Sequence, residues 1–112
     1  MKMWIDDLRP APEGYAWCKS VDQAKETIIY LETDLEYHWN VYGYKSTRME
    51  VELLDMDHDA GDYAQYGGDY IRLLDWLEET GRNYPIRIHS MNPVGVENMR
   101  RIIERNNWRE IK

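Results

Sequence analysis

Five aspartates gather around one histidine near the middle of this chain. Residues 50–62, EVELLDMDHDAGD, begin as an apolar run and end in carboxylates on both sides of His58. No Lys or Arg occurs between Arg48 and Arg72 to balance these acids, which are Asp55, Asp57, Asp59, Asp62 and Asp69. Like charges at short range raise each other's pKa and cost stability, and a bound cation or a catalytic task is the usual compensation. The segment therefore predicts a functional site at the end of a strand.

Two other strand-like segments end in polar side chains of the same kind. The apolar residues 3–5 stop at Asp6-Asp7, and residues 86–89 end in His89, which Ser90 follows. Ligands of open parallel sheets bind beyond the carboxyl ends of the strands, at the point where the strand order reverses. The sequence therefore predicts that these residues share one site with Asp57 and His58.

The elements that must position these residues alternate along the chain. A Ser20–Gln23 capping box predicts a helix to about residue 33, Asp69 is expected to cap a second helix that ends at Gly81, and Asn92-Pro93 predicts a third. Strands are expected at residues 3–5, 15–18, 51–54, 86–89 and 108–111. Strands joined by single helices predict parallel pairing with right-handed crossovers, hence a doubly wound α/β sheet.

Composition limits the class of protein. A chain of 112 residues is expected to form one domain, residues 1–112, and no apolar run is long enough for a membrane span or a signal peptide. The single cysteine, Cys18, excludes an internal disulfide and favours a reducing cytoplasm. The net charge of −7 argues against a DNA-binding or membrane-binding surface.

Two segments differ from the rest of the chain, one in net charge and one in hydrophobic periodicity. Residues 82–112 hold seven Lys/Arg against three Asp/Glu, a net +4 that leaves −11 for residues 1–81, which suits either a metal with an anionic ligand or ordinary surface helices. Residues 34–49 have no clean period and fit either a helical extension or a hairpin through Gly43. His38 in this segment is expected to be structural or exposed.

The arrangement resembles the receiver domains of two-component signalling. The resemblance implies Mg²⁺ at Asp6, Asp7 and Asp57, a phosphoacceptor at Asp57, and Ser90 in contact with a phosphoryl group. The lysine that ends strand 5 in receivers could fall only on Lys112. The implied fold is a three-layer, doubly wound parallel sheet of five strands, flavodoxin-like, in the order 2-1-3-4-5, without the helix after strand 1 and without the final helix.

A closer resemblance, over nearly the whole chain, is to the cyclic-phosphate processing receiver domains. It rests on four motifs: WIDDLRPAPEGY (residues 4–15), DHDAGDY (57–63), GGDYIRLLDWLEE (67–79) and IHSMNPVGVENMR (88–100). This resemblance implies an enzyme that acts on cyclic phosphates. His58 and His89 have no counterpart in signalling receivers and favour catalysis.

The expected site combines these residues in separate roles. His58 and His89 are expected to exchange protons as general acid and base, with Asp57 in the same catalytic group. Asp6, Asp7 and Asp57 would hold a divalent cation, Mg²⁺ or alternatively Mn²⁺, that neutralises phosphate charge. A phosphate-containing ligand would be bound, in this expectation, by Arg9, Ser90 and Asn92.

Several alternatives stay open at this level. Asp6 and Asp7 could simply cap a turn, and either histidine could be a hydrogen-bonded structural residue. Asp55 could share a face with Asp57 or point into solvent, and is left out of the site. An EF-hand is excluded because Ala60 and Tyr66 occupy the positions of its glycine and its bidentate glutamate.

Three functions compete. The first is a metal-assisted phosphoesterase that opens a cyclic phosphate of a nucleotide or an RNA end. The second is a non-catalytic module that binds Mg²⁺ and a phosphorylated ligand or partner, and the third is a phosphoacceptor at Asp57. The two histidines favour the first, and the missing final helix disfavours the third.

Overall fold

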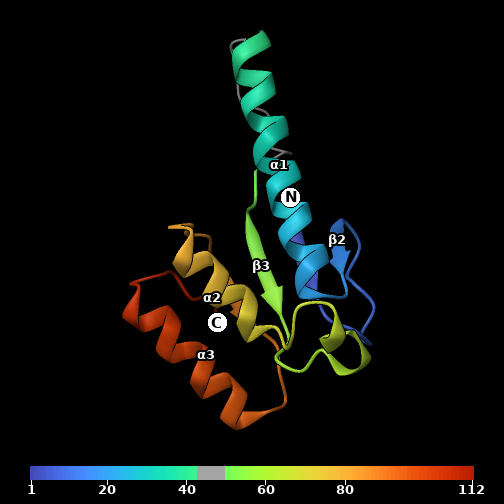
Figure 1. Ribbon diagram of the computed structural model, residues 1–112, viewed down its shortest axis with the longest axis vertical. Helices are drawn as coiled ribbons and strands as arrows, with labels where there is room; N and C mark the ends of the chain where they lie inside the picture. Colours follow the sequence, from blue (N-terminus) through green and yellow to red (C-terminus); the bar gives the residue numbers. More distant parts are fainter. Residues whose placement is uncertain (43–49) are drawn as a thin grey trace.

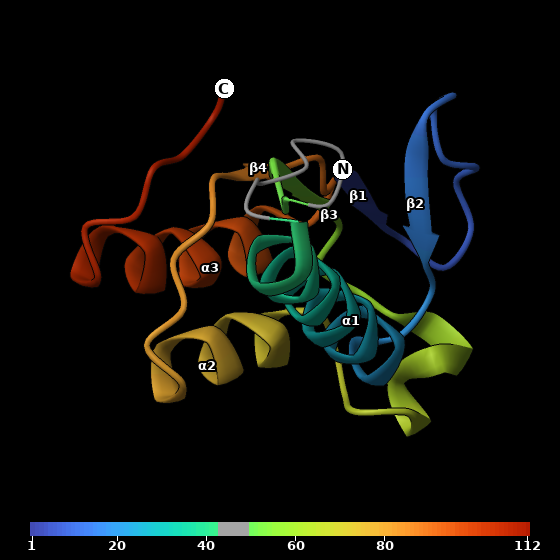
Figure 2. The ribbon, with the colours of Figure 1, turned by 90° about the horizontal axis from the view of Figure 1, so that it is seen from above.

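The sheet is parallel throughout, as the alternation of elements predicts. A computed structural model (Figure 1) describes residues 1–42 and 50–112, with side chains to residue 33 and from residue 50. Four strands pair in the order β2-β1-β3-β4 in this part of the chain (Figure 2). They are β1 (Lys2–Ile5), β2 (Tyr15–Cys18), β3 (Leu53–Met56) and β4 (Ile86–Ile88). The order reverses beside β1, so the predicted switch point lies between the ends of β1 and β3.

Three α-helices begin close to where their capping signals stand. In α1 (Val21–Tyr42), the Ser20 hydroxyl accepts from the Gln23 N–H at 3.0 Å and the Gln23 side chain accepts from the Lys19 N–H. In α3 (Pro93–Arg105), the Asn92 side chain accepts from the Gly95 N–H at 3.0 Å, as the Asn-Pro pair predicts. The predicted cap of α2 (Ile71–Glu79) is wrong, because Tyr70 occupies the N-cap position and its side chain makes no capping hydrogen bond.

All three helices lie on one face of the sheet, so the described fold has two layers where three were expected (Figure 2). The topology explains this difference. The connections that carry helices all advance in the direction from β2 towards β4, and right-handed crossovers in one direction fall on one face. Only the β1–β2 connection runs the other way, and it is a loop with Pro10, Pro12 and Gly14. We call the face without helices the open face.

The predicted fifth strand is reduced to a single bridge. Glu110 pairs in parallel with Ile86, supported by the Ile86 N–H to Arg109 oxygen bond and the Ile111 N–H to Ile86 oxygen bond. Its position beside β4 agrees with the expected order, but one bridge is less than a strand. A five-stranded sheet is therefore not observed in the described residues.

Strand β3 starts two residues later than the predicted 51–54, and this shift places Asp55 inside the sheet. Leu54 and Met56 are fully buried towards the helices, and the alternation of side chains sends Asp55 to the open face. Asp55 is nevertheless only 2% exposed. The two expectations for Asp55 are thus resolved: it does not point into solvent.

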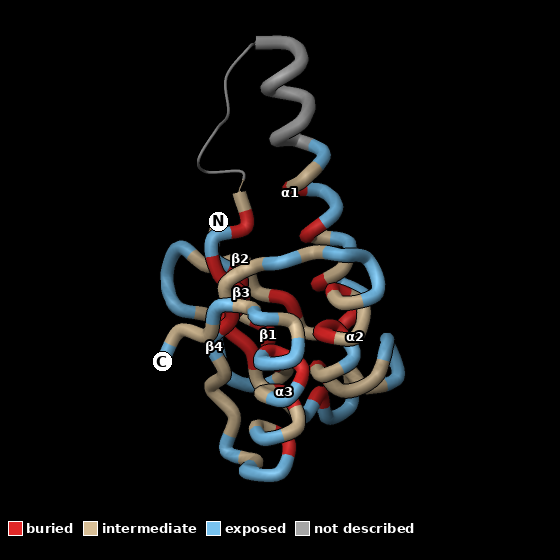
Figure 3. The backbone as a smooth tube through the Cα atoms, turned by 90° about the vertical axis from the view of Figure 1, so that its left-hand side faces the viewer, coloured by how far each residue is buried: buried red, intermediate tan, exposed pale blue. Residues whose placement is uncertain are grey.

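The core lies between the sheet and the helix layer, where the buried backbone segments gather (Figure 3). It contains Met3 and Ile5 of β1, Ile28 of α1, Leu74 of α2 and Met99 of α3. Helix α1 continues past the predicted end at residue 33 to Tyr42, which agrees with the helical alternative up to that point. The rest of the predicted hairpin alternative, and the side chain of His38, lie outside the described residues. None of the described helices is both long and apolar enough to cross a membrane.

Candidate functional site

Three carboxylates meet at the switch point. Ile5 pairs with Met56 across β1 and β3, so the residues that follow, Asp6 and Asp57, leave the sheet side by side. Asp7 joins them, and one oxygen of each of the three carboxylates lies within 4.8 Å of the others. The structure therefore brings together the three residues expected to hold the cation. Their all-oxygen donor set fits a hard divalent cation such as Mg²⁺.

Within this cluster, the charge of Asp7 is not balanced by its surroundings. Partial burial raises the pKa of Asp7, and the negative charges of Asp6, Asp57 and Asp62 raise it further. Gly61 gives Asp7 its space, because a Cβ at Gly61 would lie 2.5 Å from an Asp7 carboxylate oxygen. Gly61 begins the short 3-10 helix η1 (Gly61–Gln65), so this turn is packed directly against the acidic cluster.

Asp6 is held from several sides. Its Oδ1 accepts from the backbone N–H groups of Leu8 at 2.9 Å and Arg9 at 3.0 Å. Its Oδ2 is 2.9 Å from His89 Nε2, and its backbone oxygen accepts from the Trp17 indole N–H. Burial by itself would raise the pKa of Asp6, but the two backbone N–H groups and His89 outweigh it and hold that pKa below its ordinary value.

His89 is engaged through both ring nitrogens. Its Nδ1 is 2.7 Å from Asp55 Oδ1, opposite the contact of its Nε2 with Asp6. The Trp4 ring stacks on the imidazole with centroids 3.9 Å apart and planes at 5°. His89 therefore lies on the open face, enclosed by β1 and β3.

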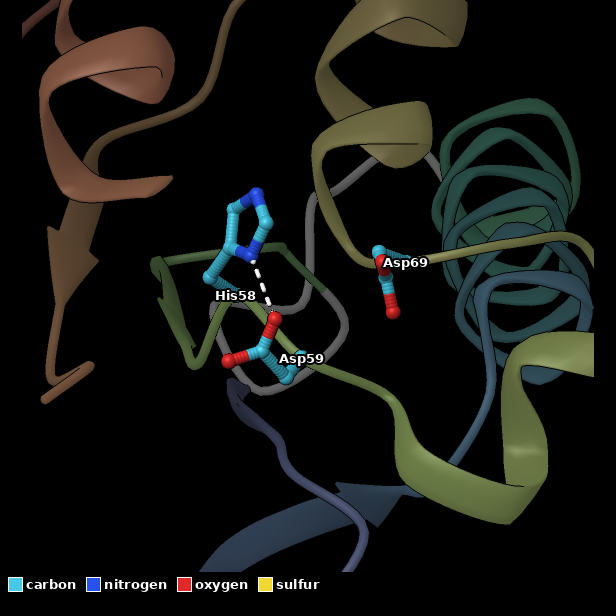
Figure 4. Close-up of side chains that lie close together, drawn as sticks. All are labelled: His58, Asp59 and Asp69. Atoms are coloured by element: carbon cyan, nitrogen blue, oxygen red, sulfur yellow. Dashed lines mark hydrogen bonds and ion pairs between the residues drawn. The ribbon is translucent and has the colours of Figure 1, made fainter. Parts of the chain in front are cut away.

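His58 lies on the other side of the sheet. Its Nδ1 is 2.8 Å from Asp59 Oδ1 (Figure 4). The ring packs against the first turn of α3, where a Cβ on Gly95 would be 2.4 Å from His58 Cγ. The Asn92 amide contacts the same pair, with Nδ2 3.3 Å from Asp59 Oδ2. The hydrogen bond to His58 lowers the pKa of Asp59. Within the described residues, His58 Nε2 has no protein partner.

The expected pairing of the two histidines is not what this geometry favours. His58 contacts α3 on the helix side, whereas His89 contacts Trp4 on the open side. Neither ring hydrogen-bonds to the other's partners in the part of the chain that is described. The physical reason is strand alternation. His58 continues the helix-facing positions Leu54 and Met56. His89 follows Ile88, which pairs with Met56, and therefore points to the opposite face.

The three residues expected to bind a phosphate have different surroundings. Exposed Arg9 donates from Nη1 to the His89 backbone oxygen at 2.8 Å, which ties the Pro-rich loop to the end of β4. The Ser90 hydroxyl accepts from the Asn92 N–H, and Ser90 opens onto a groove of about 680 Å³ along α3. Asn92 already caps α3, so the free N–H groups expected at this helix start are partly occupied.

Sequence reasoning missed the roles of Asp55 and Trp4. The local pattern contains no signal for either, because their partner His89 stands 34 residues from Asp55 along the chain. Asp69, predicted as a helix cap, instead accepts from the Ala60 N–H at 3.0 Å. With His58 and Asp59 it forms a second group of candidate ligands within 4.8 Å (Figure 4). Hydrogen bonds within the chain already account for this second group.

Comparison with known proteins supports the resemblance seen in the motifs. No curated protein and no solved structure matches the sequence significantly. The model of one family, described as the cyclic-phosphate processing receiver domain, matches residues 1–105. The match includes the acidic cluster, both histidines and Ser90. The chain therefore belongs to the cyclic-phosphate processing receiver domain family.

Proposed function

We propose that this protein is a divalent-cation-dependent phosphoesterase that hydrolyses a cyclic phosphate. The observation that carries the proposal is the cluster of Asp6, Asp7 and Asp57, whose oxygens converge within 4.8 Å. Its negative charge is uncompensated at Asp7, where burial and, after it, neighbouring carboxylates raise the pKa. A divalent cation held there would neutralise phosphate charge and polarise the phosphorus centre. Membership of a family named for cyclic-phosphate processing supports the choice of substrate class.

The reaction is the addition of water across one ester bond of the ring. A bond forms between the water oxygen and phosphorus, one ring P–O bond breaks, and the leaving oxygen gains a proton as water loses one. Arg9 donates one of its five N–H groups to the His89 backbone oxygen, which leaves four for phosphate oxygens. The Ser90 hydroxyl, whose oxygen accepts from Asn92, still has its own proton to donate.

His58 is the better candidate for proton transfer. Asp59 fixes its Nδ1, which leaves Nε2 to take or give a proton, as in other carboxylate-oriented histidines. His89 has carboxylates at both nitrogens and therefore no lone pair free to act as a base. His58 therefore stays the expected proton carrier, and His89 has a structural role in the site.

Because both ring nitrogens of His89 contact carboxylates, a second candidate is also favoured: a module that binds the cation and a phosphorylated ligand without hydrolysis. With one proton carrier instead of two, binding without turnover is chemically reasonable. A phosphoacceptor role for Asp57 is the third candidate. It predicts that acetyl phosphate adds one phosphoryl group, which the variant Asp57→Asn cannot accept.

One experiment separates these functions. Calorimetry with Mg²⁺ and Mn²⁺ measures cation affinity, and ³¹P NMR follows 2′,3′- and 3′,5′-cyclic nucleotides with cation or with chelator. We expect cation-dependent turnover that Asp57→Asn abolishes, and that His58→Gln lowers by about 100-fold or more because a general acid or base contributes that much. Cation affinity should survive in His58→Gln.

The matched control is Asp75→Asn, which removes one carboxylate from an exposed ion pair on α2. It should change neither cation affinity nor turnover. Cyclic nucleotide binding without turnover would replace the esterase proposal with the binding module. Turnover that persists in chelator would contradict the role assigned to the acidic cluster.

A further inference from the structure

An imidazole lies between two buried carboxylates on the open face of the sheet. Asp6 is 1% exposed and Asp55 is 2% exposed, and the His89 side chain between them is 12% exposed. The nitrogen–oxygen distances are 2.7 Å to Asp55 and 2.9 Å to Asp6. Both ring nitrogens lie at hydrogen-bond distance from carboxylate oxygens, so the imidazole bridges the two acids.

The three residues come from three strand segments and are fixed by packing. Asp6 follows β1, Asp55 lies inside β3, and His89 follows β4. Trp4 covers one side of the imidazole ring, stacked almost parallel at 3.9 Å. The Trp4 indole N–H donates to the Arg9 oxygen, and Arg9 donates to the His89 oxygen, which closes a ring of contacts around the site. The imidazole therefore cannot turn without breaking contacts to several elements.

This arrangement decides the orientation of Asp6. One oxygen of Asp6 is held by His89, and the other by the N–H groups of Leu8 and Arg9. For Asp7, in contrast, burial and the neighbouring acids raise the pKa, and only its own backbone N–H acts against them. In metal sites, the outer partners of a ligand set its orientation, and their loss typically weakens metal binding 10- to 100-fold.

We propose that His89 and Asp55 are positioning residues that hold Asp6 in place for the cation, in the order Asp55–His89–Asp6. The inference rests on the cation site proposed above. Asp55 acts through His89, and His89 acts through Asp6, so neither touches the substrate. The role differs from proton transfer, because it acts on cation affinity before any chemical step.

The test compares cation affinity among variants of the full chain by calorimetry with MgCl₂. Asp55→Asn keeps an oxygen that can accept from His89 but removes the charge, and His89→Gln keeps one donating nitrogen in place of two ring nitrogens. We expect both to bind Mg²⁺ about 10- to 100-fold more weakly than the original chain. If His89→Gln fails to fold, Asp55→Asn gives the answer by itself.

Two controls separate positioning from simple charge and from simple stability. Asp62→Asn removes a charge that Asp7 feels through space, and the loss of such an exposed interaction should weaken Mg²⁺ binding by at most about fivefold. Glu32→Gln breaks the partly buried ion pair with Arg82, away from the strand ends. It should lower stability and leave Mg²⁺ affinity unchanged.

A second readout needs no cation. Hydrogen exchange of the Leu8 and Arg9 amides, measured in chelator, should become faster in Asp55→Asn and His89→Gln but not in Glu32→Gln. If the original chain binds no cation, the proposed function fails, while this exchange still decides whether His89 and Asp55 position Asp6. Two results would overturn the inference: an Asp55→Asn variant with unchanged affinity and unchanged exchange, or a His89→Gln variant that loses turnover with cation affinity intact.

Discussion

The two histidines at neighbouring strand ends occupy opposite kinds of environment. His89 lies on the open face, with buried carboxylates at both nitrogens and Trp4 stacked on its ring. His58 lies on the helix side, with one nitrogen on an Asp59 side chain that is 61% exposed and its ring on the backbone of Gly95. His89 is thus hydrogen-bonded at both ring nitrogens, and His58 at only one. A histidine that is locked at both nitrogens serves structure and charge, whereas one with a free nitrogen can serve proton transfer.

The largest expected effect comes from removing His89. His89→Ala leaves Asp6 and Asp55 as neighbouring buried carboxylates without their shared partner, and removing the partner of buried carboxylates costs about 3–5 kcal/mol. Urea unfolding measures the free energy of unfolding. The control Arg87→Ala, at an exposed position of β4, should stay within about 0.5 kcal/mol of the original. A loss below about 1 kcal/mol for His89→Ala would mean that the two environments do not differ as described.

The next effect tests the contact between His58 and α3. Gly95→Ala would place a methyl group 2.4 Å from His58 Cγ, so overpacking should cost about 1–3 kcal/mol. In a His58→Ala background the clash is absent, and the same substitution should instead stabilise α3 by up to about 1 kcal/mol, because Ala is the better helix former. A double-mutant cycle by thermal or urea unfolding checks the reversal of sign. The same cost in both backgrounds would show that His58 does not rest on Gly95.

His58→Ala alone should have a smaller effect on stability than His89→Ala. It removes a ring that is about as buried as that of His89 (13% against 12% exposed), but only one hydrogen bond, and that bond goes to an exposed carboxylate instead of two buried ones; the expected loss is about 1–2 kcal/mol. Turnover of the cyclic phosphate should nevertheless be lost. The loss of stability, measured by unfolding, and the loss of turnover, measured by ³¹P NMR, are compared on the same samples of each variant. A His58→Ala variant as destabilised as His89→Ala would contradict the difference between the two histidine environments.

The smallest expected effect concerns Asp7, and here the substitution should raise the stability of the protein. The pKa of Asp7 is raised in the folded protein, so its ionised form costs stability as the pH rises through that pKa. Asp7→Asn should therefore stabilise the cation-free protein at pH 7 by about 0.5 kcal/mol, a typical size for a half-exposed charge interaction. Below the ordinary value of 3.8 the difference should vanish, because Asp7 is then protonated in both states. Thermal unfolding in chelator at pH 7 and pH 3 measures both. Added Mg²⁺ should stabilise the original chain and not the variant.

Local patterns were sufficient for much of the framework. The alternation of strands and helices, the Ser20–Gln23 box and the Asn92-Pro93 start each depend on residues within a few positions, and the structure confirms them. The prediction that Asp6, Asp7 and Asp57 meet also follows from local pattern, because parallel strands align their carboxyl ends at one edge. The two-layer arrangement was implicit in the missing helices together with the handedness of the crossovers.

Tertiary structure alone decided what each acid and histidine faces. The start of β3 at Leu53 instead of residue 51 made Asp55 a buried partner of His89, and one residue of phase sent His89 and His58 to opposite faces. These contacts join Asp6, Asp55 and His89 across as many as 83 positions of the chain. The sequence by itself determined which groups reach the edge of the sheet. Their partners depended on strand alternation and packing, because a side chain's charge and hydrogen bonds are set by neighbours that only the folded chain brings near.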